Sequence, residues 1–386
     1  MGASPVSGTA VGGLEGVVGR ACLLAYAGTA RNDVALVERG NALLETALAE
    51  LARGVGAPGL WGGLADVRFA LAHLVEGDEG DHALGVIDDA LIEALRAVDE
   101  RIDLIGGLAG IGAAALEDPA RGRGAELATR VLDALERSAE VDAAGVSWFT
   151  PPHQMPAWQR ERCPDGHWNL GLAHGIPGVI GFLAGAVIAE LEAGRARGLL
   201  ERAVPWLLAA APPRSPARFP SWCGRGATDE PARLAWCYGD AGVAITLLAA
   251  ARACGNAAWA DEARTIARGM AARTFDDSGV RDMGICHGAA GVAHIFNRLY
   301  QATGDEVLGD AARRWFARLL AMRRPGEAVA GFPARNHVDG QDVWVVDDGV
   351  LMGACGVGLV LLSAVSELEP AWDRALLCGV APREAS

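Results

Sequence analysis

Basic residues are a minority in this chain of 386 residues, with 34 lysines and arginines against 48 aspartates and glutamates and a formal net charge of −14. A protein that binds nucleic acid through a charged surface is expected to show the opposite balance. The sequence therefore predicts no nucleic-acid partner. Hydrophobic residues make up 51% of the chain, which is enough for a large globular core.

Cysteine is also scarce, since the chain has only eight such residues. This number does not make the dense disulfide framework of short secreted domains. The first residues, MGASPVSGTAVGG, contain neither a basic region nor a continuous apolar core, so we expect no signal peptide. These features predict a cytoplasmic protein whose cysteines are buried, bound to a metal or catalytic.

Two long stretches, residues 168–189 and 349–366, lack Asp, Glu, Lys and Arg entirely. Their length alone is compatible with membrane spans. The first stretch, however, contains Asn169, His174 and Pro177, and both contain several glycines. We therefore expect buried helices that begin with turn residues, and no transmembrane segment.

A short phrase of the form Gly-x-x-Gly recurs along the chain, and such self-similarity is typical of repeat folds. The first glycines of the phrases are Gly13, Gly63, Gly107, Gly175, Gly239, Gly288 and Gly353, at intervals of 44 to 68 residues. Only the second phrase lacks its later glycine, because Asp66 takes that position. Each phrase is followed by a mostly apolar segment and then by an amphipathic one.

The amphipathic segments show helical periodicity. The apolar residues that share a face are Leu308, Ala311, Trp315 and Leu319 in one segment, and Leu44, Leu48 and Leu51 in another. Each repeat thus predicts a helical hairpin with an apolar inner helix and a half-exposed outer helix. Convincing β-alternation is scarce, and the run DVWVVDD (residues 342–348) predicts a loop or an isolated strand.

Seven such hairpins favour a closed ring, because an open array needs polar capping repeats. The seventh repeat is as apolar as the others. The sequence therefore predicts an all-α fold, namely an α/α toroid of seven helical hairpins with inner and outer helix rings. We expect one domain over residues 1–386.

The positions just before the reference glycines carry reactive side chains in repeats three to six. These side chains are Asp103, His174, Arg233, Cys237, Tyr238, Cys286 and His287. Equivalent positions of a ring of repeats lie at the same end of it. We therefore expect the seven side chains to converge around one mouth of the toroid.

Cys237, Cys286 and His287 predict a metal site. Two thiolates and one imidazole suit Zn²⁺, and three protein ligands with one open position are typical of a catalytic zinc. The alternative is a pair of buried cysteines beside a hydrogen-bonded core histidine. The shared position in the repeat favours the metal. The other cysteines are expected to be structural or incidental, and they are Cys22, Cys163, Cys223, Cys254, Cys355 and Cys378.

Three segments, WNLGLAHGIPGVIGF, RLAWCYGDAGVA and GICHGAAGVA, resemble the lanthionine synthetase C (LanC) family in order and spacing. The resemblance spans essentially the whole chain, and the length of the chain is similar to that of a stand-alone cyclase. It implies one Zn²⁺ per chain, held by Cys237, Cys286 and His287. It also implies acid–base catalysis by His174 with Asp103 nearby.

The resemblance further implies that Arg233 and Tyr238 are polar residues around the metal. Family members close thioether rings, (methyl)lanthionines, by adding cysteine thiols to dehydroalanine or dehydrobutyrine in a dehydrated precursor peptide with a leader. Zinc keeps such a thiol as thiolate, and Arg233 is expected to stabilise the enolate that forms. A dehydratase partner and a membrane-associated biosynthetic complex remain open.

Several alternatives also remain open. One alternative within the LanC resemblance is an enzyme that adds glutathione to dehydrated residues in proteins. A zinc prenyltransferase-like toroid requires a basic, aromatic-lined pocket for a diphosphate, and no cationic cluster lies near these motifs. A toroidal glycosidase requires two carboxylates across a cleft, where the chain offers Asp103 and Asp240. The non-enzymatic alternative is a peptide-binding scaffold.

Overall fold

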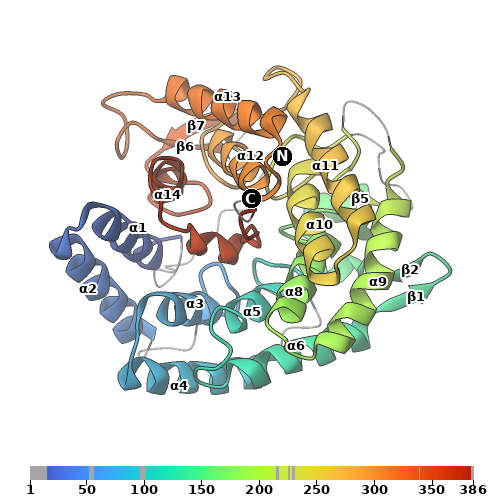
Figure 1. Ribbon diagram of the computed structural model, residues 1–386, viewed down its shortest axis with the longest axis horizontal. Coiled ribbons are helices and arrows are strands. Elements are labelled where there is room, and N and C mark those ends of the chain that lie inside the picture. Colours follow the sequence, from blue (N-terminus) through green and yellow to red (C-terminus); the bar gives the residue numbers. More distant parts are fainter. Residues whose placement is uncertain are drawn as a thin grey trace.

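The structure is a computed structural model, and it describes residues 15–51, 56–95, 101–213, 217–224, 227, 231–338 and 340–383. The described helices form a ring in two layers (Figure 1). The inner helices are α1 (Val17–Arg31), α3 (Leu64–Leu74), α5 (Leu108–Ala115), α8 (Ile176–Ile188), α10 (Asp240–Cys254), α12 (Ala289–Thr303) and α14 (Ala354–Val365). The outer helices are α2 (Val34–Leu51), α4 (Asp78–Ala94), α6 (Gly124–Ser138), α9 (Ala193–Ala210), α11 (Ala257–Ala271) and α13 (Glu306–Met322).

The ring is closed, because α14 packs against both α12 and α1 (Figure 1). The predicted all-α toroid with inner and outer helix rings is therefore confirmed. The seventh repeat differs in detail: among the described residues, α14 is followed by the short 3-10 helix η3 (Ala371–Leu376) instead of an outer helix. Gly13, the first reference glycine, lies outside the described residues.

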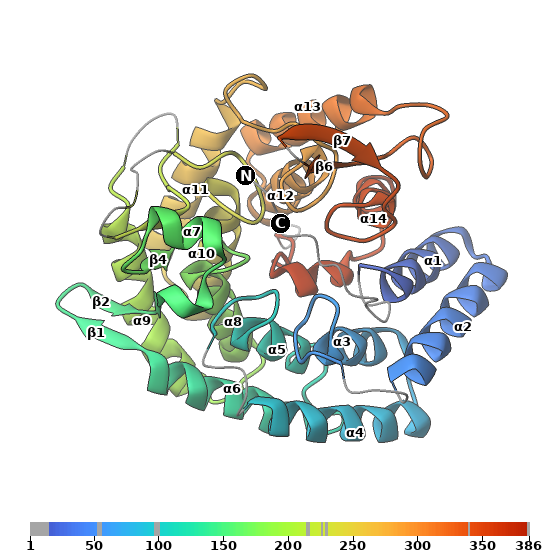
Figure 2. The same cartoon turned by 180° about the vertical axis from the view of Figure 1, so that it is seen from behind.

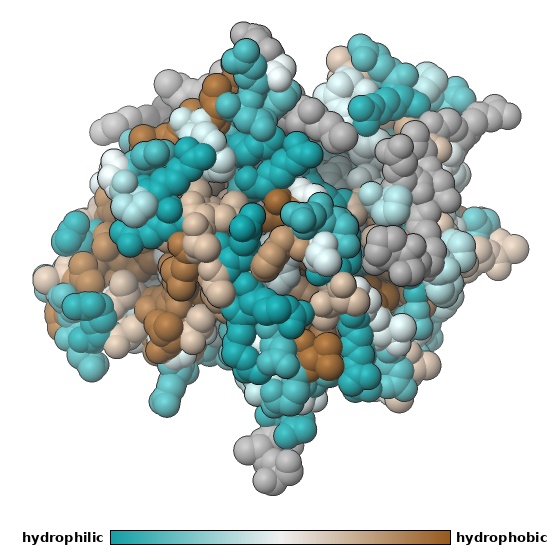
Figure 3. Space-filling view, turned by 90° about the horizontal axis from the view of Figure 1, so that it is seen from above, coloured by the Kyte–Doolittle hydropathy of each residue, from teal (hydrophilic) through white to brown (hydrophobic). Residues whose placement is uncertain are grey.

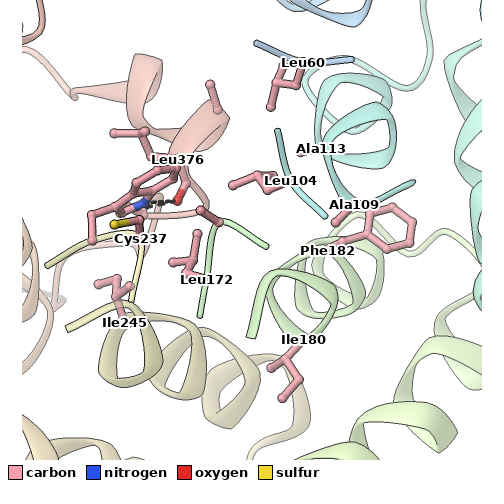
Figure 4. Close-up of a cluster of buried hydrophobic side chains, with 14 of the residues drawn as sticks. Leu60, Leu104, Ala109, Ala113, Leu172, Ile180, Phe182, Cys237, Ile245 and Leu376 are labelled. Carbon is pink, nitrogen blue, oxygen red and sulfur yellow. Dashed lines mark hydrogen bonds between the residues drawn. The ribbon is translucent and has the colours of Figure 1, made fainter. Parts of the chain in front are cut away.

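The inner helices α3, α5, α8, α10 and α12 are mostly buried, as their composition predicts, whereas most residues of α1 are only half-buried. All eight residues of α5 are buried. Close packing between inner helices requires glycine, since a Cβ atom on Gly112 of α5 would lie 2.4 Å from the ring of Phe182 on α8. Figure 4 shows Phe182 beside Ala109 of α5, within the apolar centre.

The outer helices are amphipathic. On α13 the four apolar residues predicted to share a face are all buried, and on α2 Leu44 is buried while Leu48 and Leu51 are half-buried. Many hydrophilic side chains and scattered hydrophobic ones lie on the face seen in Figure 3. Residues 168–189 and 349–366 contribute α8 and α14, and none of the described helices is long and apolar enough to cross a membrane.

The Gly-x-x-Gly phrases begin the inner helices in a shared backbone arrangement. The residue after the first glycine donates its N–H to the carbonyl seven positions earlier, as in Leu108 to Arg101 (2.8 Å) and Ala289 to Asp282 (2.9 Å). The later glycine faces this folded-back loop. A Cβ atom on Gly291 would lie 1.9 Å from the carbonyl oxygen of Ile285, so the turn excludes any side chain there.

Short strands occur only in the connections between described helices. They form a hairpin of β1 (Glu140–Asp142) and β2 (Gly145–Ser147), a sheet in the order β3 (Phe149–Thr150), β4 (His167–Asn169), β5 (Trp222–Cys223), and a hairpin of β6 (Ala334–Val338) and β7 (Gln341–Val345). The run DVWVVDD is therefore a paired strand in its first part. The helices η2 (Pro152–Gln154) and α7 (Ala157–Arg162) lie in the connection between β3 and β4 (Figure 2).

The C-terminal segment packs against α12 and the loop before α10. Asp373 is hydrogen-bonded to His294 (2.9 Å) and forms an ion pair with Arg298 (3.0 Å) of α12, and all three side chains are buried. The indole Nε1 of Trp236 donates to the carbonyl oxygen of Leu376 at 2.9 Å, the dashed bond in Figure 4. The segment therefore links α12 to the loop that carries Cys237.

Candidate metal centre and active site

Backbone hydrogen bonds join the loops before successive inner helices around the ring. Ala173 donates its N–H to the carbonyl of Cys237 (3.2 Å), Cys237 donates to Cys286 (3.1 Å), and Cys286 donates to Leu351 (2.9 Å). Each of these residues stands two positions before its reference glycine. The predicted convergence of equivalent positions at one mouth thus has a direct structural cause.

Cys237, Cys286 and His287 form a cluster, and their ligand atoms all lie within 4.8 Å of one another. Cys237 is buried, while Cys286 and His287 are half-buried. The pKa of the Cys237 thiol lies well below its ordinary value, because it accepts a hydrogen bond from Cys286 and because His287 and Arg233 lie nearby. The cluster therefore favours a negative charge on sulfur.

The imidazole of His287 is oriented for a ligand. Its Nε2 atom lies 3.3 Å from Oδ2 of the buried Asp282, while its buried Nδ1 atom has no hydrogen-bond partner among the described residues. Metal-bound histidines usually donate their second ring N–H to such a carboxylate. Two thiols and an imidazole whose other nitrogen lacks a partner fit the ligand set of a zinc ion.

His174 and Asp103 lie on neighbouring loops. The two loops are joined by a hydrogen bond from the Leu104 N–H to the Ala173 carbonyl (2.9 Å). The His174 side chain is exposed, whereas Asp103 is buried and accepts from the Gly106 N–H at 2.7 Å. Asp103 also approaches Arg101, with 3.9 Å between Oδ2 and Nε. Direct orientation of His174 by Asp103 stays a prediction.

Tyr238 lies between the metal cluster and the sheet of β3, β4 and β5. Its hydroxyl accepts from Nδ2 of Asn169 at 3.3 Å and also bonds to Gln159. Burial raises the pKa of this phenol above its ordinary value. Its ring centroid lies 5.9 Å from that of His174, so the tyrosine forms one wall beside the exposed histidine.

The family model for lanthionine synthetase C-like proteins matches residues 12–377. The chain belongs to the lanthionine synthetase C-like family. Its structure is similar to that of nisin cyclase, with a TM-score of 0.79, 20% sequence identity, and coverage of 96% of this chain and 93% of that chain. A weaker likeness is to cellobiose 2-epimerase from Bacillus thermoamylovorans, with a TM-score of 0.50, 11% identity, and coverage of 92% and 88%. Both likenesses concern the toroidal fold.

In this LanC-like chain, none of the remaining cysteines belongs to the cluster. Cys22, Cys163, Cys355 and Cys378 are buried, and Cys223 and Cys254 are half-buried. Within the described ranges, no second group of histidine, cysteine or carboxylate side chains is arranged to hold a metal. The burial of the six remaining cysteines is consistent with the structural role expected for them.

The sequence reasoning missed several residues of the site in this LanC-like protein, namely Gln159, Asn169, Trp222 and Asp282. One signal was available for two of them. Asn169 and Asp282 stand six positions before their reference glycines, and each side chain accepts from the backbone N–H two residues later. Gln159 and Trp222 lie in connections outside the repeats, so their positions cannot be found by counting from a reference glycine.

Proposed function

We propose that this protein is a zinc-dependent lanthipeptide cyclase, which adds peptide cysteine thiols to dehydroalanine or dehydrobutyrine and so forms (methyl)lanthionine rings. The observation that carries the proposal is the cluster of Cys237, Cys286 and His287 at the mouth of a LanC-like toroid. The exposed His174 on the neighbouring loop supplies an acid–base group at the same mouth.

The two thiols and Nδ1 of His287 would hold the zinc ion, with Asp282 orienting the imidazole from behind. Bound zinc at such a site offers an open position for the peptide sulfur and keeps it as thiolate at neutral pH. The lowered pKa of Cys237, set first by the hydrogen bond from Cys286, agrees with a site that stabilises anionic sulfur.

The residues of the chain account for the remaining steps. The peptide thiol loses its proton, its sulfur bonds to the β-carbon of the dehydro residue, and the electrons of the double bond move toward the carbonyl as an enolate. Arg233 is exposed at the mouth, and its guanidinium stabilises this negative charge. His174 removes the thiol proton or protonates the α-carbon, so that the addition is balanced without another reactant.

The same proposal includes the substrate and setting of the enzyme. The substrate is a dehydrated precursor peptide with a leader, which requires a dehydratase to act first. The family match over residues 12–377 supports one cyclase domain. The absence of a described helix that could span a membrane is compatible with the proposed cytoplasmic location, including a place in a membrane-associated complex.

Ring closure leaves the peptide mass unchanged, so the test counts thiols. A peptide with one dehydroalanine and one cysteine is incubated with the protein, alkylated, and analysed by mass spectrometry. We expect wild type to protect the cysteine from alkylation, and H174N to slow this protection at least about a hundredfold. H82N, on the exposed face of α4, serves as the matched control.

The outcome also separates the alternatives. Full alkylation after incubation with metal-loaded, folded wild type contradicts the cyclase proposal. A glutathione adduct on the dehydro residue, formed when glutathione is added, supports the glutathione-transferring alternative. Peptide binding without either product supports the scaffold.

A further inference from the structure

Four aromatic rings form a continuous row that ends at the proposed proton-transfer residue. The centroid of Trp158 on α7 lies 5.9 Å from that of Trp222 on β5, which lies 6.3 Å from Tyr238. Tyr238 in turn lies 5.9 Å from His174. We call Trp158, Trp222, Tyr238 and His174 the aromatic row.

Two polar groups of the row already have partners within the protein. The Tyr238 hydroxyl is engaged by Asn169 and Gln159, and the Trp222 side chain makes a hydrogen bond with the Cys163 thiol. Trp158 and Trp222 are only half-buried, so part of each side chain meets solvent. The exposed part of the two tryptophans is therefore mainly aromatic, with the Arg162 guanidinium carbon 5.8 Å from the ring centroid of Trp158.

The row is supported from behind and is held rigidly. Trp222 pairs with Asn169 across β4 and β5, and the ring of the fully buried His167 lies 5.4 Å from that of Trp222. Burial lowers the pKa of His167 to about 4, so this backing is uncharged at neutral pH. A Cβ atom on Gly171 would lie 2.4 Å from the Tyr238 ring, which shows how closely the backbone packs there.

We propose that the aromatic row is a subsite for an apolar or aromatic side chain of the peptide, beside the cysteine that is joined. Rigid aromatic residues give a large contact area at low cost in conformational entropy. Because the row ends at His174, a side chain bound on it belongs to a residue near the reacting cysteine. This inference rests on the proposed function, since it assumes that a peptide enters this mouth.

The test measures binding separately from ring closure. Two fluorescein-labelled peptides carry a dehydroalanine and have alanine in place of cysteine, and they differ only in whether phenylalanine or serine flanks that alanine. Their dissociation constants for the metal-loaded protein are measured by fluorescence anisotropy. We expect the phenylalanine peptide to bind wild type roughly tenfold more tightly than the serine peptide.

The variants W222A and W158A should reduce this preference to about twofold or less, while W222F should retain most of it. The matched control is Y300A, because Tyr300 is a half-buried aromatic residue near the opposite end of α12. An equal affinity of wild type for both peptides, or a preference unchanged in W222A, overturns the subsite. No binding of either peptide overturns it as well, whereas a failure of the cyclase proposal appears independently as full alkylation in the thiol assay.

Discussion

The backbone N–H of Cys237 donates a hydrogen bond to the carbonyl oxygen of Cys286 at 3.1 Å. The two residues stand at equivalent positions of consecutive repeats, 49 residues apart in the chain. The bond joins the loops at the same residues that carry the thiols. The pairing of these two turns therefore brings both sulfur atoms together. The metal cluster depends on this arrangement of the ring as well as on the identity of its three residues.

Removal of either thiol should abolish metal binding. Purified wild type is expected to contain about one zinc per chain, and C237A and C286A should contain almost none, because two ligands do not hold a catalytic zinc tightly. Elemental analysis by mass spectrometry measures the content, and circular dichroism checks the fold. C254A, at the half-buried end of α10, should keep its zinc. Folded wild type that is free of metal when prepared without chelator contradicts the prediction.

The repeat register explains why so much of the site could be predicted. Cys237, Cys286 and His287 are far apart in sequence, but equivalent positions of a ring meet at one mouth, and the structure brings these three together. The toroid followed from the same register, together with the apolar inner segments. Asp66, the departure from the glycine pattern, has a local reason: its buried carboxylate accepts from the Gly62 N–H at 3.0 Å.

The repeat register has no information about segments outside the repeats. Trp222 and Gln159 reach Tyr238 from connections whose short strands lack enough residues to show an alternation. The contact of Leu376 with Trp236 joins positions 140 residues apart, and no periodicity in the chain predicts it. These contacts depend on tertiary packing, which a pattern in one sequence does not encode.

Replacement of Asp282 should weaken metal binding without loss of the fold. In D282N the Oδ1 atom can still accept from the Gly284 N–H, but the second oxygen that faces His287 is replaced by an amide. Loss of such a carboxylate partner lowers metal affinity about 10- to 100-fold. Competition with a chromogenic zinc chelator measures the affinity.

The matched control is D347N, because Asp347 occupies the same position in the seventh repeat and accepts from the Gly349 N–H at 2.8 Å. The loop that contains Asp347 bears no proposed ligand, so the zinc affinity of D347N should equal that of wild type. If D282N binds zinc as tightly as D347N does, the buried carboxylate serves only the turn.

A methyl group at Gly291 should destabilise the protein severely. Its Cβ atom would lie 1.9 Å from the carbonyl oxygen of Ile285, and this oxygen is backbone, which cannot move aside as a flexible side chain could. We expect G291A to lower the free energy of unfolding by roughly 3 kcal/mol. G198A on the exposed face of α9 meets nothing within 4 Å and should instead stabilise by about 0.5–1 kcal/mol. Urea denaturation of both variants measures these changes, and equal stabilities contradict the steric argument.

His167 should make the protein less stable in mild acid. Its ring is fully buried, neither ring nitrogen has a partner among the described residues, and burial lowers its pKa from 6.5 to about 4. The unfolded chain therefore takes up a proton before the folded one does. The neutral histidine contributes to the free energy of unfolding above pH ~6.5, and this contribution is lost as the pH falls toward ~4. The loss amounts to roughly 2 kcal/mol by pH 5.

H167Q removes the titrating group, so its free energy of unfolding should fall less than that of wild type between pH 7.5 and pH 5. Urea denaturation at both pH values, with EDTA present so that metal release does not contribute, measures this difference. H82Q is the control, because the His82 side chain is exposed on α4 and meets water in both states. The same pH dependence in wild type and H167Q would mean that His167 is already solvated in the folded protein. The packing of a buried, neutral His167 against Trp222 would then no longer support the proposed aromatic row.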